Sequence, residues 1–225
     1  MDKAPGPDGF SGRFFQAAWP IIKSDVLRAV QHLYALQSRG MSKLNNAVVV
    51  LLPKMDGASE VKDFRPISLT HSFGKLFSKL LANRRAPRLS ALVAENQSAC
   101  VKGRSIHDNF KMVQLTTRAL HVGRTPAMLL KVDISKAFDS VSWPFLIRVL
   151  RHMGFGLKFI GWVCIILSSA SSRILLNGVP GRVIHHRRGL RQGDPLSPTL
   201  FLFVMEVLNA ALRRAEALEI LSPLP

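Results

Sequence analysis

The stretch Arg188-Gly-Leu-Arg-Gln-Gly-Asp-Pro-Leu-Ser-Pro198 carries two glycines and two arginines directly before a proline. Glycine lets a ligand approach the backbone closely, and Pro195 suits the first turn of a helix. Free backbone N–H groups at such a helix start, with Arg187 and the two arginines just ahead, would suit a phosphate group. The open alternative is an ordinary basic turn before a core helix. The stretch therefore predicts a helix start beside either a phosphate site or a plain surface turn.

Upstream of this stretch, Asp133 closes an apolar run, residues 127–134, which predicts a buried strand. A carboxylate on such a strand needs an ion-pair partner, a metal or hydrogen bonds. Lys131 and Lys136 are near enough in sequence to form a salt bridge. The residues alone therefore leave a structural and a metal-binding role open for Asp133.

A second carboxylate, Asp139, follows six residues later and is expected to cap the helix that begins at Ser142 or to pair with an arginine. A phosphatase with a nucleophilic aspartate would need a second aspartate two residues after the first. Ser135 stands there, and no later lysine and aspartate complete that pattern. The phosphatase reading is therefore excluded.

A third candidate site combines Lys54, at the end of an apolar run, with Arg65 in the segment Phe64-Arg-Pro-Ile-Ser-Leu69. A residue before proline is held extended, which helps to aim the guanidinium group. Both cations could face one anion, or both could be solvated surface charges. This pair alone does not decide between the two.

The composition describes a folded, strongly basic protein. Apolar residues make up 48% of the chain, and 31 Lys and Arg against 14 Asp and Glu give a formal charge of +17. No acid occurs between Ser140 and Gly193. Such a surplus favours a polyanionic partner, either nucleic acid or an anionic membrane. A rich apolar core argues against a generic basic protein of the ribosomal or histone type.

Membrane attachment and secretion are not expected. The longest apolar stretches, residues 47–53 and 162–167, are far shorter than the roughly 20 residues of a spanning helix. The first residues are charged and rich in Gly and Pro, unlike a signal peptide. We therefore expect an intracellular protein with no membrane partner.

Hydrophobic periodicity and turn residues predict a single α+β unit. An entry turn is expected at residues 3–9, and a hairpin at 173–187 turning near Asn177-Gly178 and Pro180-Gly181. Asp108 is the expected N-cap of its helix. The expected strands are 46–52 and 127–134, and the expected helices are 14–33 (divided at Pro20), 73–85, 108–120, 144–153, 157–168 and 195–217.

Seven segments, taken in order, resemble the reverse transcriptases of LINE-type, non-LTR retrotransposons. They are Lys-Ala-Pro-Gly-Pro-Asp-Gly-Phe (3–10), Leu-Pro-Lys (52–54), Phe-Arg-Pro-Ile-Ser-Leu (64–69), Glu-Asn-Gln-Ser-Ala-Cys-Val-Lys-Gly-Arg-Ser-Ile (95–106), Lys-Val-Asp-Ile-Ser-Lys-Ala-Phe-Asp-Ser-Val (131–141), Leu-Asn-Gly (176–178) and Arg-Gln-Gly-Asp-Pro-Leu-Ser-Pro (191–198). The resemblance covers about residues 3–218. The Gln-Gly-Asp-Pro form favours this family over retroviral and group II intron relatives.

The resemblance implies the fingers and partial palm of a right-hand polymerase, with helices packed on a small, mainly antiparallel sheet. Residues 1–125 would be fingers-like and residues 126–220 an incomplete palm, within a partial reverse transcriptase domain 1–225 without a thumb. It implies RNA-directed DNA polymerase activity, with an RNA template, a DNA primer and deoxynucleoside triphosphates as partners, and a nuclear location.

The resemblance also implies roles for individual residues. Asp133 would be the catalytic ligand of Mg²⁺, and Phe138 the side chain that excludes a ribose 2′-hydroxyl. Arg65, with Lys54 as a weaker candidate, would contact the triphosphate. Gln192 and Gly193 would lie under the incoming nucleotide, and nucleic acid would be contacted by Arg104, Arg187, Arg188 and Arg191.

The sequence departs from the family in its acidic residues. The Asp-Asp pair that the family carries after this stretch does not follow Asp194 here. The later acids are Glu206, Glu216 and Glu219, all expected on the terminal helix. Two adjacent metals need several carboxylates. We therefore expect a truncated retroelement copy with little or no polymerase activity. The alternatives are a non-catalytic nucleic-acid-binding remnant and a purely structural basic protein.

Overall fold

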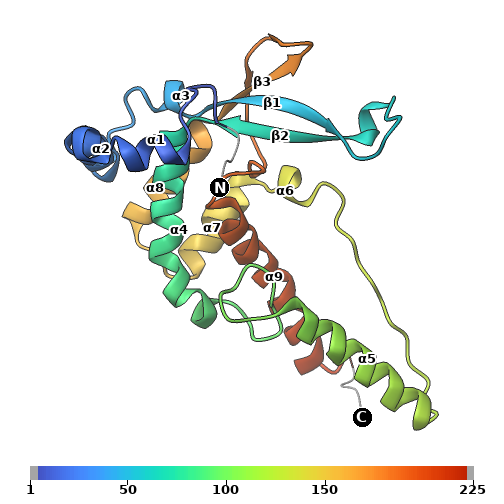
Figure 1. Ribbon diagram of the computed structural model, residues 1–225. Coiled ribbons are helices and arrows are strands. Elements are labelled where there is room, and N and C mark those ends of the chain that lie inside the picture. Colours follow the sequence, from blue (N-terminus) through green and yellow to red (C-terminus); the bar gives the residue numbers. More distant parts are fainter. Residues whose placement is uncertain (1–4, 222–225) are drawn as a thin grey trace.

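A computed structural model describes residues 5–221, so the first residues of the predicted entry turn and the last four residues of the chain lie outside it (Figure 1). The described part begins with a turn at residues 7–8, followed by α1 (Gly12–Ala17) and α2 (Trp19–Tyr34). Pro20 lies in the first turn of α2. The predicted division of this helical segment is therefore confirmed, because proline is tolerated at a helix start.

The five strands form one mixed sheet. They are β1 (Asn46–Pro53), β2 (Phe64–Thr70), β3 (Ser171–Leu176), β4 (Val179–Pro180) and β5 (Ile184–His185). β1 pairs antiparallel with β2 and parallel with β3, and β3 pairs antiparallel with β4 and β5. The sheet therefore joins strands from the N-terminal and C-terminal halves of the chain, and the outer part of the β1–β2 hairpin extends beyond β3 (Figure 1).

Two predicted strand features are confirmed. The run at 46–52 forms β1, and the hairpin turns at Asn177-Gly178, where both residues have a positive φ (51° and 81°). Asparagine and glycine tolerate this conformation best, as a two-residue hairpin turn requires.

Helices pack below the sheet around one apolar core. α4 (Ser72–Leu92), α7 (Trp143–His152), α8 (Leu157–Ser168) and α9 (Ser197–Ala217) supply most of it. Three short elements lie elsewhere: α3 (Met41–Leu44) before β1, a 3-10 turn (Val61–Asp63) between β1 and β2, and α6 (Ala137–Ser140) before α7. The most deeply buried side chains are Phe77, Leu81, Leu146, Leu150, Val163, Leu200 and Phe203. The predicted helices at 144–153, 157–168 and 195–217 are confirmed to within two residues, and the α+β class is confirmed.

α4 is longer than predicted and continues through Pro87 to Leu92. Its C-terminal end is held by Arg104, whose guanidinium donates to the carbonyl oxygens of Ser90, Val93, Ala94 and Gln97. Carbonyls at a helix end have no intrahelical partner, so a nearby cation stabilises them. Burial of Leu89 in the core adds to this.

α5 (Ile106–Val122) projects from the body of the molecule, and none of its residues is buried (Figure 1). Its N-cap is Ser105, whose side chain accepts a hydrogen bond from the His107 N–H (3.2 Å). The prediction that Asp108 caps this helix is therefore wrong; Asp108 lies in the first turn, where a negative charge still favours the helix dipole. None of the helices described is both long and apolar enough to cross a bilayer.

The predicted strand at 127–134 is wrong. These residues form an extended connection between α5 and α6 that pairs with no described strand, and Met128 is 92% exposed. An apolar run forms a strand only where a neighbouring strand supplies hydrogen bonds. β1 and β3, the interior strands of the described sheet, pair with other partners on both sides.

Three hydrogen bonds join the segment after this connection to the segment before α9. The N–H of Gly189 donates to Val141 O (2.8 Å), the N–H of Leu190 donates to Phe138 O (2.7 Å), and Trp143 Nε1 donates to Gly189 O (2.8 Å). Gly189 has a φ of +84°, and a Cβ there would lie 2.8 Å from the carbonyl oxygen of Asp139. Glycine is therefore required where these two segments meet.

We expect Gly189→Ala to lower the free energy of unfolding by about 2–4 kcal/mol, from left-handed strain plus a backbone clash. Gly154→Ala is the matched control, because Gly154 has a φ of +76° and no neighbouring heavy atom within 4 Å. Its free energy of unfolding should fall only by the cost of a positive φ for a residue with a Cβ, about 1–2 kcal/mol. Urea denaturation measures both, and equal losses would show that the contact with Asp139 is unimportant.

Candidate nucleotide and nucleic-acid site

A cleft of about 560 Å³ lies between the sheet and the segment that precedes α9. Val49, Ser68 and Ile174 line it from the sheet, and their strand registers place them on one face. Residues 186–192 form the opposite wall, together with Asp139. The cleft therefore exists because the two segments joined at Gly189 lie below this sheet face.

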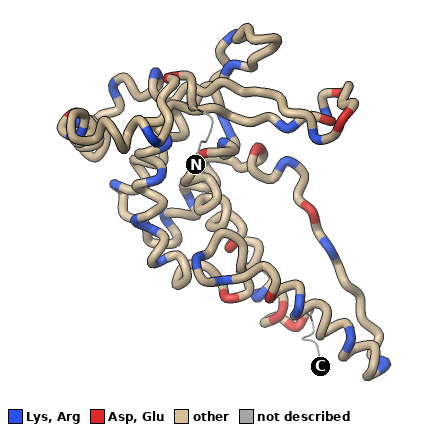
Figure 2. Tube along the Cα trace, in the orientation of Figure 1, with Lys and Arg blue, Asp and Glu red and all other residues tan. Residues whose placement is uncertain are grey.

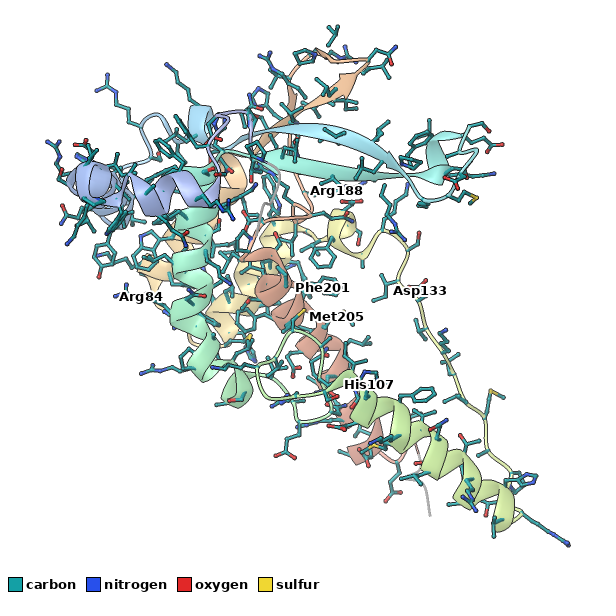
Figure 3. All side chains as sticks on the ribbon, in the orientation of Figure 1. Arg84, His107, Asp133, Arg188, Phe201 and Met205 are labelled. Carbon is teal, nitrogen blue, oxygen red and sulfur yellow. The ribbon has the colours of Figure 1, made fainter. Side chains whose placement is uncertain are left out.

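Two of the predicted nucleic-acid contacts, Arg187 and Arg188, lie in this wall and are exposed. Neither forms a hydrogen bond or ion pair with any described residue, so both guanidinium groups are available to an anion. Figure 3 shows Arg188 between the sheet and the helices below it. Lys and Arg are spread along most of the chain trace, whereas a group of acids lies at the tip of the β1–β2 hairpin (Figure 2). The cleft is therefore suited to a phosphate-bearing ligand.

Gln192 and Gly193 continue the same wall and are exposed. Gly193 has a φ of +94°, and a Cβ there would lie 3.4 Å from the carbonyl oxygen of Ser68 on β2. The positive φ favours glycine at this position, and the segment lies beside the sheet. Gln192 lines the cleft itself.

Arg191 occupies a different environment from its neighbours. It is buried, and its guanidinium donates to Asn45 Oδ1 and to Asn45 O, both at 2.9 Å. Asn45 in turn donates to Ile166 O (2.6 Å) and Ser169 Oγ (2.9 Å) at the end of α8. Arg191 touches the cleft, but its charge is committed to the protein, as is that of Arg104 at the end of α4.

Asp194 is enclosed beside this network. Its carboxylate accepts from Ser78 Oγ (3.0 Å) and from the N–H of Leu196 (2.8 Å). Burial raises the pKa of Asp194 above its usual range, while these hydrogen bonds and the nearby Arg191 oppose the rise. The acid of the Gln-Gly-Asp-Pro stretch therefore organises the start of α9 and does not face the cleft.

Lys54 and Arg65 lie toward the tip of the β1–β2 hairpin and do not line the cleft. The ammonium of Lys54 donates to Lys62 O. Arg65 is exposed, and strand alternation places its side chain on the sheet face opposite Pro66 and Ser68, which line the cleft. A ligand in the cleft therefore lies closer to Arg187 and Arg188 than to Lys54 or Arg65.

Phe138 and Asp133 lie in different parts of the structure. Phe138 is half-buried, and its ring stacks on Phe201 of α9 at a centroid distance of 4.8 Å. Asp133 is exposed on the connection after α5, apart from the cleft wall that carries Arg188 (Figure 3). The structure thus keeps Phe138 near the cleft wall through its bond to Leu190 but does not bring Asp133 there.

The described residues do not fit a pair of catalytic metal ions. No group of three or more His, Cys, Asp or Glu side chains in residues 5–221 is arranged to hold a metal. Asp139 lines the cleft, but the cleft's other titratable groups are His186 and arginines. Two adjacent divalent ions require several carboxylates, and this cleft offers one.

His186 is a cleft residue that the sequence did not reveal. Its Nε2 lies 2.7 Å from Ser172 Oγ on β3. Burial lowers the pKa of His186, and the charge of Arg191 lowers it further, while Asp139 acts in the opposite direction. A histidine between a short strand and an arginine pair carries no recognisable sequence signal, so only the fold shows its position.

The raised pKa of Asp194 predicts a pH effect on stability. Because the native state binds this proton more tightly than the unfolded state, ionisation of Asp194 lowers the free energy of unfolding as pH rises from about 4 through the native pKa. Asp194→Asn keeps an oxygen for the Leu196 N–H and removes this ionisation. We expect the variant to gain stability relative to the wild type over that range.

Urea denaturation of both proteins at a series of pH values measures the difference. Asp108→Asn, an exposed acid on α5, is the control and should follow the wild type. If the free energy of unfolding of the wild type instead increased relative to that of Asp194→Asn as pH rises, the predicted sign would be wrong.

Comparison with known proteins shows the family. Residues 52–221 match the family model described as reverse transcriptase (RNA-dependent DNA polymerase). A Xenopus laevis relative, the transposon TX1 uncharacterized 149 kDa protein, is 32% identical over 95% of this chain and 16% of its own length. Retrovirus-related Pol polyproteins of R2 elements are 28% identical in Nasonia vitripennis and 27% in Drosophila melanogaster, over 94% and 92% of the chain.

The chain spans about a fifth or less of the length of these relatives: 16%, 20% and 19%. The matched region contains β1 from Leu52, β2, the cleft wall and all of α9. The motifs and the relatives agree, and the chain belongs to the reverse transcriptase (RNA-dependent DNA polymerase) family, among the proteins of non-LTR retrotransposons.

Proposed function

We propose that the chain supplies the template- and nucleotide-binding part of RNA-directed DNA synthesis by a non-LTR retrotransposon. The observation that carries this proposal is the cleft itself, in which two uncommitted arginines, Arg187 and Arg188, face an uncharged sheet surface. A polyanion held there gains charge contacts without base-specific readout. The RNA template, DNA primer and deoxynucleoside triphosphates are the proposed ligands, and a nuclear site of action would follow.

Within this proposal the cleft residues have distinct roles. Arg187 and Arg188 contact phosphates, Gln192 and Gly193 form the surface under the incoming nucleotide, and Phe138 limits the space at the ribose. Arg65 and Lys54, at the hairpin tip, make a second, weaker contact to phosphate. Arg191 and Arg104 act indirectly, because each holds in place a segment that borders a binding surface.

The domain assignment belongs to the same proposal. Residues 1–125 would act as fingers and residues 126–220 as part of a palm. The parallel pairing of β1 with β3 supports a tight junction between these parts, since it places strands of both in one sheet.

Mg²⁺ would supply charge neutralisation and activation of the primer hydroxyl in a complete site. The carboxylates described here do not meet that need, so we assign no catalytic step to them. We propose that this chain binds nucleic acid and adds nucleotides weakly or not at all. A non-catalytic binding role is therefore the second candidate function, favoured by a cleft with two free arginines and one acid.

We expect Arg188→Ala to weaken binding of an RNA–DNA primer–template several-fold and to reduce the slope of log K against log salt by about 0.7–0.9, the loss of one phosphate contact. Arg148→Ala, an exposed arginine on α7 outside the cleft, is the matched control and should change little. Arg65→Ala should have a smaller effect than Arg188→Ala. Fluorescence anisotropy at several salt concentrations measures all four proteins.

Equal effects of the Arg188 and Arg148 substitutions would mean that net charge, and not the cleft, binds the nucleic acid. A larger effect for Arg65 would move the phosphate contact to the hairpin tip.

Primer extension on an RNA template with Mg²⁺ and deoxynucleotides tests the chemistry separately. We expect no more extension from the folded chain than from its Asp133→Ala variant, because Asp133 belongs to no group of three or more potential metal ligands among the described residues. Extension by the wild type that disappears in Asp133→Ala would show a working metal site and would contradict the non-catalytic reading.

A further inference from the structure

A second basic surface lies outside the cleft, in a hollow of about 460 Å³ between α4, α8 and the end of α2. We call it the α4 hollow and define it by its four cations and three aromatic side chains: Arg84, Arg85, Arg88, Lys158, Tyr34, Phe159 and Trp162. It shares no lining residue with the cleft. Figure 3 shows Arg84 on the outer side of α4, away from Arg188.

The cations of the α4 hollow have no acidic partner. No Asp or Glu lines the hollow, and none of its four cations forms an ion pair with a described carboxylate. Arg84 and Arg88 are four residues apart on α4, a spacing at which like charges repel. Burial lowers the pKa of Arg85, and Arg88 and Arg84 lower it further. An anion in the hollow would relieve this repulsion.

Aromatic rings orient two of these cations. The guanidinium of Arg85 lies over the Phe159 ring at 4.6 Å and near Phe155 at 5.4 Å. The ammonium of Lys158 lies 3.8 Å from the centre of the Tyr34 ring. Cation–π contacts limit the motion of long side chains, so less conformational entropy is lost when a ligand binds.

The aromatic layer is itself fixed to the core. Trp162 is buried, its indole N–H donates to Tyr34 O (3.3 Å), and its ring lies 5.0 Å from that of Tyr34. Phe159 is also buried. Phe159 and Trp162 therefore form a fixed floor beneath the cations, whereas Tyr34 lies at the edge of the hollow and is exposed.

We propose that the α4 hollow binds the phosphodiester backbone of a nucleic-acid strand, as a contact separate from the cleft. Cations spread over two helices match successive phosphates along a strand better than a single small anion. Two of the three rings, Phe159 and Trp162, are buried, and Lys158 lies over the third, so the hollow presents mainly cations and favours contact through phosphates, without sequence readout. The chain would thereby hold nucleic acid on two sides of α4, and the source of the strand, RNA or duplex DNA, is open to test.

The main test is the double charge reversal Arg84→Glu/Arg88→Glu. Both residues are exposed on α4, so folding should be retained, which circular dichroism checks. The matched control is Lys111→Glu/Arg118→Glu on α5, also exposed and with the same change in net charge. Lys158→Ala provides a second, milder variant on a different helix.

Binding is measured by anisotropy with single-stranded RNA, duplex DNA and inorganic phosphate as separate probes. We expect the α4 reversal to weaken binding of one polynucleotide at least tenfold and to reduce its salt slope by about 1.4–1.8, two phosphate contacts. The α5 control should lose much less affinity. Lys158→Ala should also bind the polynucleotide more weakly than the wild type, as the α4 reversal does. The polynucleotide more strongly affected identifies the source of the strand.

Three results would overturn the proposal: equal losses for the α4 and α5 reversals, no loss with either polynucleotide, or binding of inorganic phosphate alone. The outcome is independent of the cleft. If Arg188→Ala weakens polynucleotide binding and the α4 reversal does not, the hollow is rejected as a binding site and the proposed function is unaffected. Loss in the α4 reversal alone would support the hollow and reject the cleft as the main contact.

Discussion

The structure depends on a buried arginine whose guanidinium is hydrogen-bonded mainly by amide oxygens. Arg191 donates to both the side chain and the carbonyl of Asn45, and Asn45 holds the last turn of α8. A guanidinium that loses its partners in a protein interior costs several kcal/mol, so these hydrogen bonds must persist wherever the fold persists. Asp194, enclosed nearby, supplies a compensating negative charge.

This network lies where three parts of the chain meet. Asn45 precedes β1, Ile166 and Ser169 end α8, and Arg191 precedes α9. Satisfying one guanidinium group therefore fixes the start of the sheet relative to two core helices. The two arginines before Arg191 extend from an anchored segment, which is why the cleft wall is preorganised.

Local patterns predicted the elements whose structure depends on local contacts. The periodicity of residues 157–168 predicted α8 with correct bounds. Asn177-Gly178 predicted the turn between β3 and β4, because few other residues adopt that geometry. The run at 127–134 failed because its apolar pattern cannot show whether a pairing strand is near. Asp108 failed as a cap because Ser105, three residues earlier, satisfies the helix end first.

The candidate site was predictable in part for a related reason. The glycines at 189 and 193 were predicted to let a ligand approach the backbone, and that stays a prediction; both adopt a positive φ, and at Gly189 a Cβ would also lie 2.8 Å from the carbonyl oxygen of Asp139. The arginines could not be sorted by sequence. Arg187 and Arg188 are free, whereas Arg104 binds carbonyls at the nearby end of α4 and Arg191 binds Asn45, 146 residues earlier, and only the tertiary fold determines these contacts.

The unpaired connection that carries Asp133 has an entropic consequence. Residues 127–134 make no backbone hydrogen bond to any described residue. Fixing such a segment costs about 1–2 kcal/mol per residue, so a ligand that engages Asp133 must offset that ordering before any affinity remains. Amide protons there should exchange with solvent far faster than those of α7 and α8. Recruitment of this carboxylate thus amounts to folding coupled to binding, whatever the ligand.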